Sequence, residues 1–288
     1  MKNVLITGSN SFIGTNFEKW LKKYPDKYNV ETIDMKNKTW KDKDFSRFDV
    51  VFHVAGIAHV SSNHKLRDLY YSVNRDLAIE TARKAKAEGV KQFIFMSSII
   101  VYGSRRYNKV ISKDTIPKPV DYYGDSKFQA ELGIRSLEND YFKTVIIRTP
   151  MVYGKGAKGN YLKLSRIAKI LPIFPDYDNQ RSMIHIDNLC EFIRCIIDYE
   201  KSGLFFPQNK EYVKTSEMVK HIASAHGKKI KLVKVFNPLI KMISPIGIVN
   251  KIFGDLVYEK SMSEYEFNYR IREFKESIII TELESECN

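Results

Sequence analysis

Short apolar runs alternate with amphipathic segments through the first half of the chain. Runs rich in β-branched residues predict buried strands, and they lie at 4–7, 30–33, 50–54, 93–96 and 145–147. Apolar side chains at helical spacing predict helices between them, at 13–24, 73–88 and 126–139. Strands and helices that alternate in this way form parallel sheets with right-handed crossovers. The pattern therefore predicts an α/β fold with a doubly wound parallel sheet.

The rhythm changes after about residue 150. Gly and Lys gather between Gly154 and Gly159, and a short predicted strand at 183–186 runs into a helix with a strongly apolar face. We therefore expect two domains. The first spans residues 1–150, and the second, residues 151–288, is a smaller C-terminal α/β lobe that is partly interleaved with the first.

Composition and charge narrow the class of protein. The chain has 288 residues, 43% of them hydrophobic, which is typical of a globular protein and excludes a disordered chain. It carries 47 Lys and Arg against 34 Asp and Glu, a formal charge of +13 that favours an anionic partner. Three cysteines without C-x-x-C spacing predict neither a disulfide framework nor a zinc site. No secretion signal or membrane-spanning run is recognisable, so we expect a cytoplasmic protein.

A glycine-rich turn over residues 8–14 follows the first predicted strand and opens the first predicted helix. This context is the one that a dinucleotide-binding turn requires. Gly8 permits a tight turn, Gly14 lets the helix approach the sheet, and the helix N-terminus offers amides to a pyrophosphate. Ser11 stands where a third glycine is usual, so we expect an altered approach of the phosphate. The candidate cofactor contacts in this turn are Gly8, Ser11, Phe12, Ile13 and Gly14.

An acidic residue follows at the distance that such a turn predicts. Asp34 lies 20 residues after Gly14, at the end of the second predicted strand. Its carboxylate can accept hydrogen bonds from the adenosine ribose and would repel a 2′-phosphate, which favours NAD. Lys36 and Lys38 could neutralise a phosphate, so NADP remains the alternative cofactor.

Three polar residues form a candidate set for hydride chemistry. Ser98 ends a predicted strand, and Tyr123 and Lys127 lie four residues apart on one face of a helix. A tyrosine is a weak base at neutral pH, but a nearby ammonium lowers its pKa. The lysine can also hold the nicotinamide ribose, and the serine can bond the substrate oxygen. We therefore predict Ser98, Tyr123 and Lys127 as catalytic residues that move a proton while hydride is transferred.

Together these motifs resemble the extended short-chain dehydrogenase/reductases, and within them the NAD-dependent epimerase/dehydratase family that acts on nucleotide sugars. The resemblance covers nearly the whole chain and rests on residues 7–14, 52–56, 95–103, 123–127, 148–154 and 181–189. It implies that residues 1–150 are an NAD(P)-binding Rossmann domain and that residues 151–288 bind the nucleotide sugar. It also implies further cofactor contacts: Ala55 and Gly56 through the backbone, Asp44 and Phe45 at the adenine, and Asn74, which braces the site.

Departures from the family pattern discriminate between reactions. The dehydratases carry an acidic pair directly after the catalytic hydroxyl residue, whereas this chain has Ile99 and Ile100, which cannot move protons. Met151 replaces an asparagine common in UDP-hexose epimerases, and with the short chain it favours a reductase of a nucleotide 4-keto-6-deoxy sugar. Asp34 favours retained NAD and therefore a UDP-hexose 4-epimerase of surface polysaccharide biosynthesis. We rank the 4-epimerase first, the reductase second and a non-catalytic NAD-binding regulator third.

The substrate is expected to be a nucleotide-diphosphate sugar, UDP-linked by resemblance. Candidate contacts are Ser98, Asn160 at a helix N-terminus and Arg181, whose guanidinium suits a diphosphate. No pair of histidines has metal spacing, so no metal is predicted.

The distribution of charged and apolar residues bears on three other partners: nucleic acid, a second copy of the chain and a membrane. The lysines are scattered without a nucleic-acid-binding signature, so no nucleic acid is predicted. The apolar segment 236–257 is interpreted first as a substrate cap or a homodimer face, and second as a hydrophobic foot on an anionic membrane.

Overall fold

The computed structural model describes residues 1–58, 66–103, 110–243 and 247–283. Two compact units divide the chain. The first unit comprises residues 1–103, 116–149 and 190–207, and the second comprises residues 104–115, 150–189 and 208–288. The chain therefore passes between the units several times, and each unit is described by itself. Cys287 lies outside the described residues.

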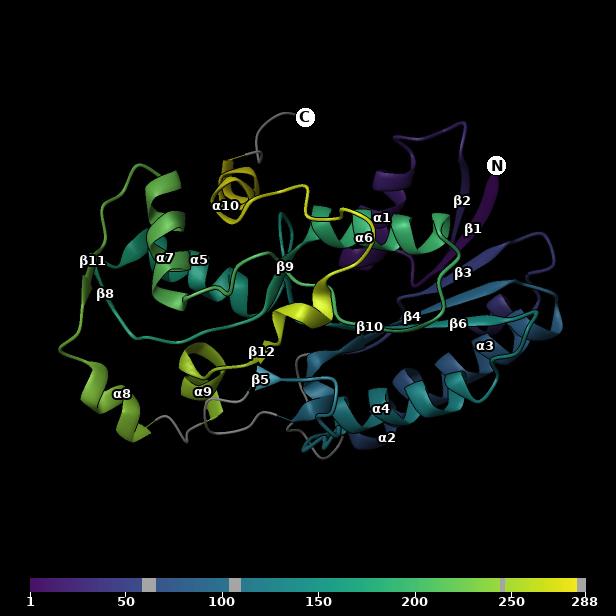
Figure 1. Ribbon diagram of the computed structural model, residues 1–288, viewed down its shortest axis with the longest axis horizontal. Coiled ribbons are helices and arrows are strands. Elements are labelled where there is room, and N and C mark those ends of the chain that lie inside the picture. Colours follow the sequence, from purple (N-terminus) through teal and green to yellow (C-terminus); the bar gives the residue numbers. More distant parts are fainter. Residues whose placement is uncertain (59–65, 104–109, 244–246, 284–288) are drawn as a thin grey trace. The chain divides into compact units, whose positions relative to one another are not determined.

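A six-stranded parallel sheet forms the centre of the first unit, which confirms the predicted fold class (Figure 1). The strand order is β10-β6-β4-β3-β1-β2. β3 and β4 are buried along their whole length, which explains why nearly continuous apolar runs in the sequence predicted them. The strands are β1 (Lys2–Thr7), β2 (Tyr28–Ile33), β3 (Val50–His53), β4 (Gln92–Ser98), β6 (Lys143–Thr149) and β10 (Gly203–Phe205).

The strand order reverses at β1, and this reversal positions the candidate site. β1 pairs with β2 on one side and with β3 on the other, with Thr7 opposite Ile33 and His53. In open α/β sheets, ligands bind beyond the carboxyl ends of strands at such a switch point. Gly8 and Ala55 follow β1 and β3 at this end of the sheet.

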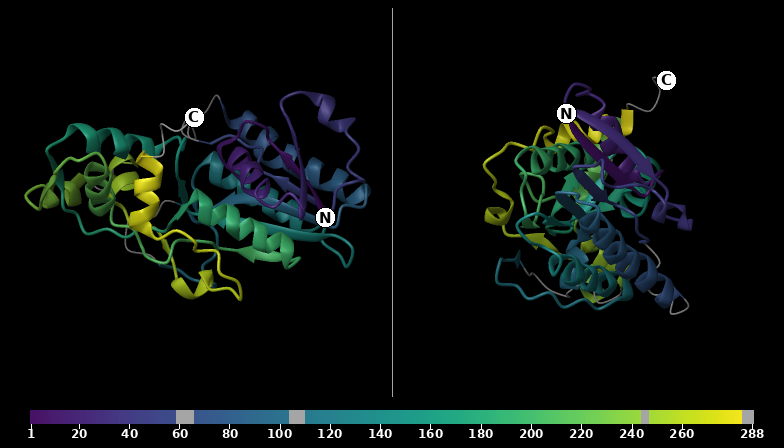
Figure 2. Two further views of the ribbon diagram at one scale, coloured as in Figure 1. Left: turned by 90° about the horizontal axis from the view of Figure 1, so that it is seen from above. Right: turned by 90° about the vertical axis from the view of Figure 1, so that its right-hand side faces the viewer.

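Helices cover both faces of the sheet (Figures 1 and 2). The helix α1 (Phe12–Leu21) packs on β1 and β2, whereas α3 (Leu77–Ala87) and α4 (Tyr122–Arg135) pack on β3, β4 and β6. One helix predicted at 73–88 is a longer composite, in which α2 (Arg67–Tyr70) and the π-helical η3 (Tyr71–Asp76) precede α3. π-Helical turns are rare in proteins, and those that occur are often found at functional sites.

The second unit has its own core. Its helices α5 (Asn160–Ile170), α7 (Thr215–Ala225) and α10 (Phe274–Leu283) pack together around buried Leu164, Val219 and Ile278. Short parallel strand pairs lie around this core. They are β7 (Met151–Tyr153) with β9 (Met183–His185), β8 (Ile173–Pro175) with β11 (Lys231–Val233), and β5 (Val110–Ile111) with β12 (Val257–Tyr258).

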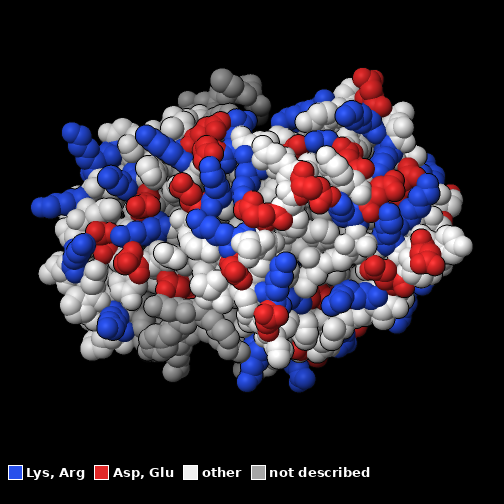
Figure 3. Space-filling model, in the orientation of Figure 1, with Lys and Arg blue, Asp and Glu red and all other residues white. Residues whose placement is uncertain are grey.

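Short helices and one longer helix complete the two units. They are the 3-10 helices η1 (Lys38–Lys41), η4 (Ile99–Tyr102) and η5 (Lys260–Ser263) and the helices α6 (Ile186–Asp198), α8 (Asn237–Ile243) and α9 (Gly247–Phe253). Basic and acidic side chains are interspersed on the face in Figure 3. No helix among the described residues is long and apolar enough to cross a membrane. In the same residues, no cluster of His, Cys, Asp and Glu could hold a metal ion.

Candidate active site

The turn between β1 and α1 has the geometry of an anion-binding loop. Gly8 adopts φ +87°, and its amide donates to the Ile33 carbonyl at 2.9 Å. Ser11 is the N-cap of α1, and its Oγ accepts from the Gly14 amide at 3.1 Å. The amides of Phe12 and Ile13 lie in the first helical turn, where an α-helix has no internal acceptors for them. These two amides can therefore face a phosphate.

Gly8 and Gly14 are required because other backbone and side-chain atoms lie very close. A Cβ on Gly8 would lie 2.9 Å from both the Cα and the amide nitrogen of Ala55. A Cβ on Gly14 would lie 2.6 Å from Ser11 Oγ and 3.1 Å from a Val54 methyl. The sequence interpretation of both glycines, tight turn and close packing, agrees with these distances.

The substitution Gly8→Ala should weaken NADH binding by about tenfold or more, because the new methyl must push the turn away from Ala55. Titration of NADH fluorescence would measure the loss. The matched control is Gly89→Ala, since Gly89 has a similar φ of +81° but nothing within 4 Å of the added Cβ. Equal NADH affinity in the two variants would show that the approach to Ala55 does not matter.

Asp34 and the pair Asp44–Phe45 occupy different environments. Asp34 directly follows β2, is exposed, and accepts a hydrogen bond from the Lys36 amide at 3.0 Å. Asp44 is also exposed, and its carboxylate accepts from the amide and hydroxyl of Ser46. The Phe45 side chain is fully buried in the core. Its amide donates to a Glu88 carboxylate, so Phe45 has a structural role in addition to the predicted adenine contact.

Asn74 fixes the loop that follows β3. This side chain is fully buried in η3, accepts from the Ile57 amide at 2.9 Å and donates to the Ile57 carbonyl at 3.1 Å. It also donates to the Ser126 hydroxyl of α4. A Cβ on Gly56 would lie 3.0 Å from Asn74 Oδ1 and 3.2 Å from Lys127 Nζ. The structure thus brings Gly56, Asn74 and Lys127 together, as a bracing role for Asn74 requires.

Ser98 and Tyr123 meet at the carboxyl end of β4. Ser98 lies close enough to Tyr123 to influence its phenol, and the Ser98 hydroxyl accepts from the Ile100 amide at 3.3 Å. Burial raises the pKa of the Tyr123 phenol above its ordinary value, while the nearby Ser98 hydroxyl opposes that rise. The sequence-based expectation of a lowered tyrosine pKa is therefore wrong. The direction of this pKa shift is decided by desolvation of the phenol, which the local spacing of residues does not reveal.

Lys127 lies one helical turn after Tyr123 and is almost completely buried. Its Nζ donates to the Met96 carbonyl at 2.9 Å and lies 4.5 Å from the centre of the Phe95 ring. Burial lowers the pKa of Lys127 to about 8, although the negative charge of Glu131 raises it. The β4 backbone thus holds the ammonium at the place where the sheet, Gly56 and Asn74 meet.

The lowered pKa of Lys127 predicts a pH dependence of stability. Between about pH 8 and the ordinary lysine value of 10.5, the unfolded chain keeps the proton and the folded chain releases it. The unfolded state then binds more protons, so this group makes the folded state more stable as pH rises. Relative to Lys127→Met, we expect wild-type stability to rise by about 1.4 kcal/mol per pH unit in that window. Urea unfolding at several pH values would test this, and parallel curves for the two proteins would contradict it.

A buried ion pair behind the candidate catalytic residues was not predicted. Glu131, four residues after Lys127, pairs with Arg148 of β6 at 2.6 Å, and the two side chains are 1% and 4% exposed. Arg148 also donates to the Tyr102 hydroxyl, and the Ser97 hydroxyl donates to Glu131. The i,i+4 spacing of Lys127 and Glu131 was a visible signal, but the arginine lies on a strand remote in sequence.

The predicted substrate contacts Asn160 and Arg181 belong to the second unit. Asn160 is the first residue of α5, after Gly159 with φ +88°. Arg181 donates to the Gly254 carbonyl at 2.8 Å, and burial lowers the pKa of its guanidinium to about 10. The nearby Asp255 carboxylate opposes that shift, and a guanidinium is suited to bidentate bonds with a diphosphate.

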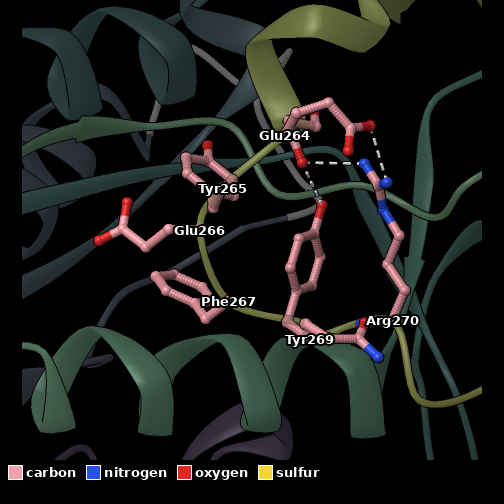
Figure 4. A pocket seen from close by; sticks show the side chains of 8 residues that line it. Glu264, Tyr265, Glu266, Phe267, Tyr269 and Arg270 are labelled. Atoms are coloured by element: carbon pink, nitrogen blue, oxygen red, sulfur yellow. Dashed lines mark hydrogen bonds and ion pairs between the residues drawn. The ribbon is translucent and has the colours of Figure 1, made fainter.

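The described surface also contains a hollow of about 250 Å³ in the second unit, lined by residues 263–270 (Figure 4). Tyr269 donates to the Ser263 carbonyl, and Arg270 pairs with Glu264 at 2.8 Å. The rings of Tyr265 and Phe267 are stacked. One stretch of chain forms this hollow, and none of the predicted site residues lines it.

Sequence comparison finds curated relatives along most of the chain. A UDP-glucose 4-epimerase of Vibrio cholerae is 32% identical over 287 residues, which cover 88% of this chain and 86% of that protein. An N-acetyl-alpha-D-glucosaminyl-diphospho-ditrans,octacis-undecaprenol 4-epimerase of Escherichia coli O157:H7 is 25% identical, covering 94% of this chain and 85% of the relative.

Structural comparison agrees on the fold. A dTDP-4-dehydrorhamnose reductase from Clostridium acetobutylicum superimposes with a TM-score of 0.75 at 20% identity, covering 97% of this chain and 98% of the other. Similar structures contain NAD in some cases and NADP in another. The sequence profile of the NAD dependent epimerase/dehydratase family matches residues 4–205. With the switch-point turn, the Ser98–Tyr123 pair and these relatives on one chain, the protein belongs to the NAD dependent epimerase/dehydratase family.

Proposed function

We propose that this chain is an NAD-dependent 4-epimerase acting on a UDP-linked hexose. The observation that carries the proposal is that Ser98 lies beside the Tyr123 phenol, with the buried Lys127 one helical turn further along α4. Bound NAD would supply the hydride acceptor and donor. It fits the chain because Gly8, where a Cβ would collide with Ala55, permits the tight turn after β1, and because the first turn of α1 presents amides to a pyrophosphate.

The proposed role of each catalytic residue follows from its position. After losing its own proton, Tyr123 as the phenolate would accept the proton from the C4 hydroxyl as hydride leaves C4, and it would return the proton when hydride comes back. Ser98 bonds the same sugar oxygen and the tyrosine, so it keeps the two oxygens within reach. Lys127 supports the phenolate electrostatically and bonds the nicotinamide ribose. Because Ile99, 4% exposed, and Ile100 follow Ser98, no acid lies there for eliminating water.

Cofactor and substrate selection rest on charged residues. Exposed Asp34 would accept the ribose hydroxyls of NAD and repel a 2′-phosphate. The buried guanidinium of Arg181 and the α5 N-terminus at Asn160 are proposed to hold the nucleotide diphosphate. The Vibrio cholerae relative reported above, 32% identical, is a UDP-glucose 4-epimerase, which supports UDP as the nucleotide.

A test begins with protein purified without added cofactor. After denaturation, mass spectrometry should find NAD close to one per chain, because an epimerase returns hydride within one turnover and need not release the cofactor. The protein should then interconvert UDP-glucose and UDP-galactose, or their N-acetyl forms, without added NAD. Retained NAD together with no epimerisation of any of these sugars would overturn the UDP-hexose assignment.

The second candidate is a reductase of a nucleotide 4-keto-6-deoxy sugar. Met151, at the start of β7, is the observation that favours it, since an asparagine is expected there in an epimerase. The fold similarity to a dTDP-4-dehydrorhamnose reductase is compatible with either reaction. An empty cofactor site, or bound NADPH, together with reduction of a 4-keto nucleotide sugar would select this candidate.

A further inference from the structure

One stretch of the second unit is basic and lacks acidic residues. From Met218 to Ile243 there is no Asp or Glu, and six lysines occur there: Lys220, Lys228, Lys229, Lys231, Lys234 and Lys241. All six are exposed. This part of the chain contributes nearly half of the net charge of +13.

The same stretch exposes large apolar side chains. Val235, Leu239 and Met242 are 75%, 52% and 71% exposed. Leu239 and Met242 lie three residues apart in α8 and share its outer face, while Ile240 is buried against the unit. Single exposed apolar residues are normal, but a helical face with several of them marks an interaction site.

A second group of exposed apolar residues lies beside the lysines. Ile170, Leu171 and Ile173 end α5 and begin β8, and all are exposed. β8 pairs with β11, which places Lys231 opposite Ile173 in the register. The Lys228 ammonium bonds the Lys169 carbonyl. We call the exposed side chains of residues 170–173 and 228–243 the basic apolar surface.

Few acidic groups neutralise this surface. Asp176 is adjacent, since its carbonyl accepts from the Asn237 side chain. The Asp176 carboxylate is paired with Lys214 at 3.0 Å and also attracts Lys234 of the surface, and Lys214 lies 3.7 Å from Asp178. The surface therefore stays positive. A second copy of the chain would bring lysines against lysines in a symmetric contact, which is unfavourable.

We propose that the basic apolar surface binds an anionic phospholipid membrane. Lysines attract the charged headgroups, and the α8 side chains enter the boundary between headgroups and acyl chains. The binding is peripheral and reversible. It does not depend on which sugar reaction the protein performs, so its failure and that of the proposed function are separable.

Co-sedimentation with vesicles tests the proposal. We expect the full chain to bind vesicles of phosphatidylcholine with phosphatidylglycerol at low salt, and to bind neither pure phosphatidylcholine nor anionic vesicles at about 0.5 M salt. The triple change K229Q/K231Q/K234Q should weaken binding by about fivefold for each lysine. The change L239S/M242S should weaken it without removing charge.

Matched controls separate this surface from general charge and apolarity. The variants K19Q/K22Q/K27Q and Ile116→Ser remove the same charge and an exposed apolar side chain in the first unit, and they should bind nearly as wild type. No binding of the wild type to anionic vesicles at low salt would overturn the proposal, as would unchanged binding by both test variants. A concentration-dependent dimer that L239S/M242S abolishes, without vesicle binding, would show instead that the surface joins two copies.

Discussion

Replacing Tyr123 by Phe is expected to lower kcat by about 10²- to 10⁴-fold, the usual contribution of a positioned acid–base group. The ring should keep its place, because it lies on α4 against the Tyr70 ring at 6.3 Å and phenylalanine preserves that contact. The affinity for NADH should change little. Steady-state assay of the purified variant with the UDP-hexose that the wild type epimerises, together with NADH titration, measures both quantities.

The neighbouring tyrosine supplies the control for this prediction. Tyr122 begins α4 one residue earlier, and Tyr122→Phe removes an equivalent hydroxyl. We expect its kcat to stay within a few-fold of wild type, since the Tyr122 hydroxyl has no part in the proposed proton path. If Tyr123→Phe turned over at the wild-type rate, the phenol would not be the acid–base group and the proposed mechanism would fail.

Replacing Arg148 by Met should lower the free energy of unfolding by about 3–5 kcal/mol, the largest stability effect that we expect. The guanidinium makes three bonds to Glu131, at 2.6, 3.1 and 3.1 Å, and one to the Tyr102 hydroxyl at 2.6 Å. Its removal leaves the Glu131 carboxylate, 1% exposed, without its cation. Urea unfolding of Arg148→Met against wild type measures the loss.

A double substitution shows how much of that loss of stability comes from leaving the Glu131 carboxylate buried without Arg148. The double variant E131M/R148M removes both ions, and buried ion pairs replaced by apolar groups of similar size are often nearly neutral. We therefore expect it to recover most of the stability. The exposed pair of Lys22 with Glu18 is the comparison, because Lys22→Met should cost less than about 1 kcal/mol. A loss as small in Arg148→Met would contradict the assignment of a buried charge pair.

The ion pair also bears on the candidate site. Glu131 raises the pKa of Lys127 against the effect of burial, and Tyr102 ends the short helix that begins after Ser98. The pair is thus built into the same layer of β4, α4 and β6 that positions the candidate catalytic residues. The activity of the less stable Arg148→Met protein should be measured well below its unfolding temperature. A loss of activity is then not confused with unfolding of the protein.

Sequence patterns determined the parts of this protein that depend on neighbours a few residues apart. Alternating apolar runs and helical faces predicted the strands of the sheet except β10, a three-residue strand too short for a clear pattern. The glycine-rich turn was legible because Gly8, Ser11 and Gly14 act within one strand–helix junction. The i,i+4 spacing of Tyr123 and Lys127 likewise follows from helix geometry alone.

The tertiary structure decided what depends on burial and on distant partners. The pKa of Tyr123 rises because packing removes water from the phenol, and local spacing could not reveal that. Lys127 donates a hydrogen bond to the Met96 carbonyl, 31 residues away in sequence, and Glu131 accepts hydrogen bonds from Arg148 on β6. Segments 190–207 and 208–288 are adjacent in sequence, but they belong to different units. Local periodicity specifies secondary structure, whereas desolvation and long-range pairing arise only when the whole chain has folded.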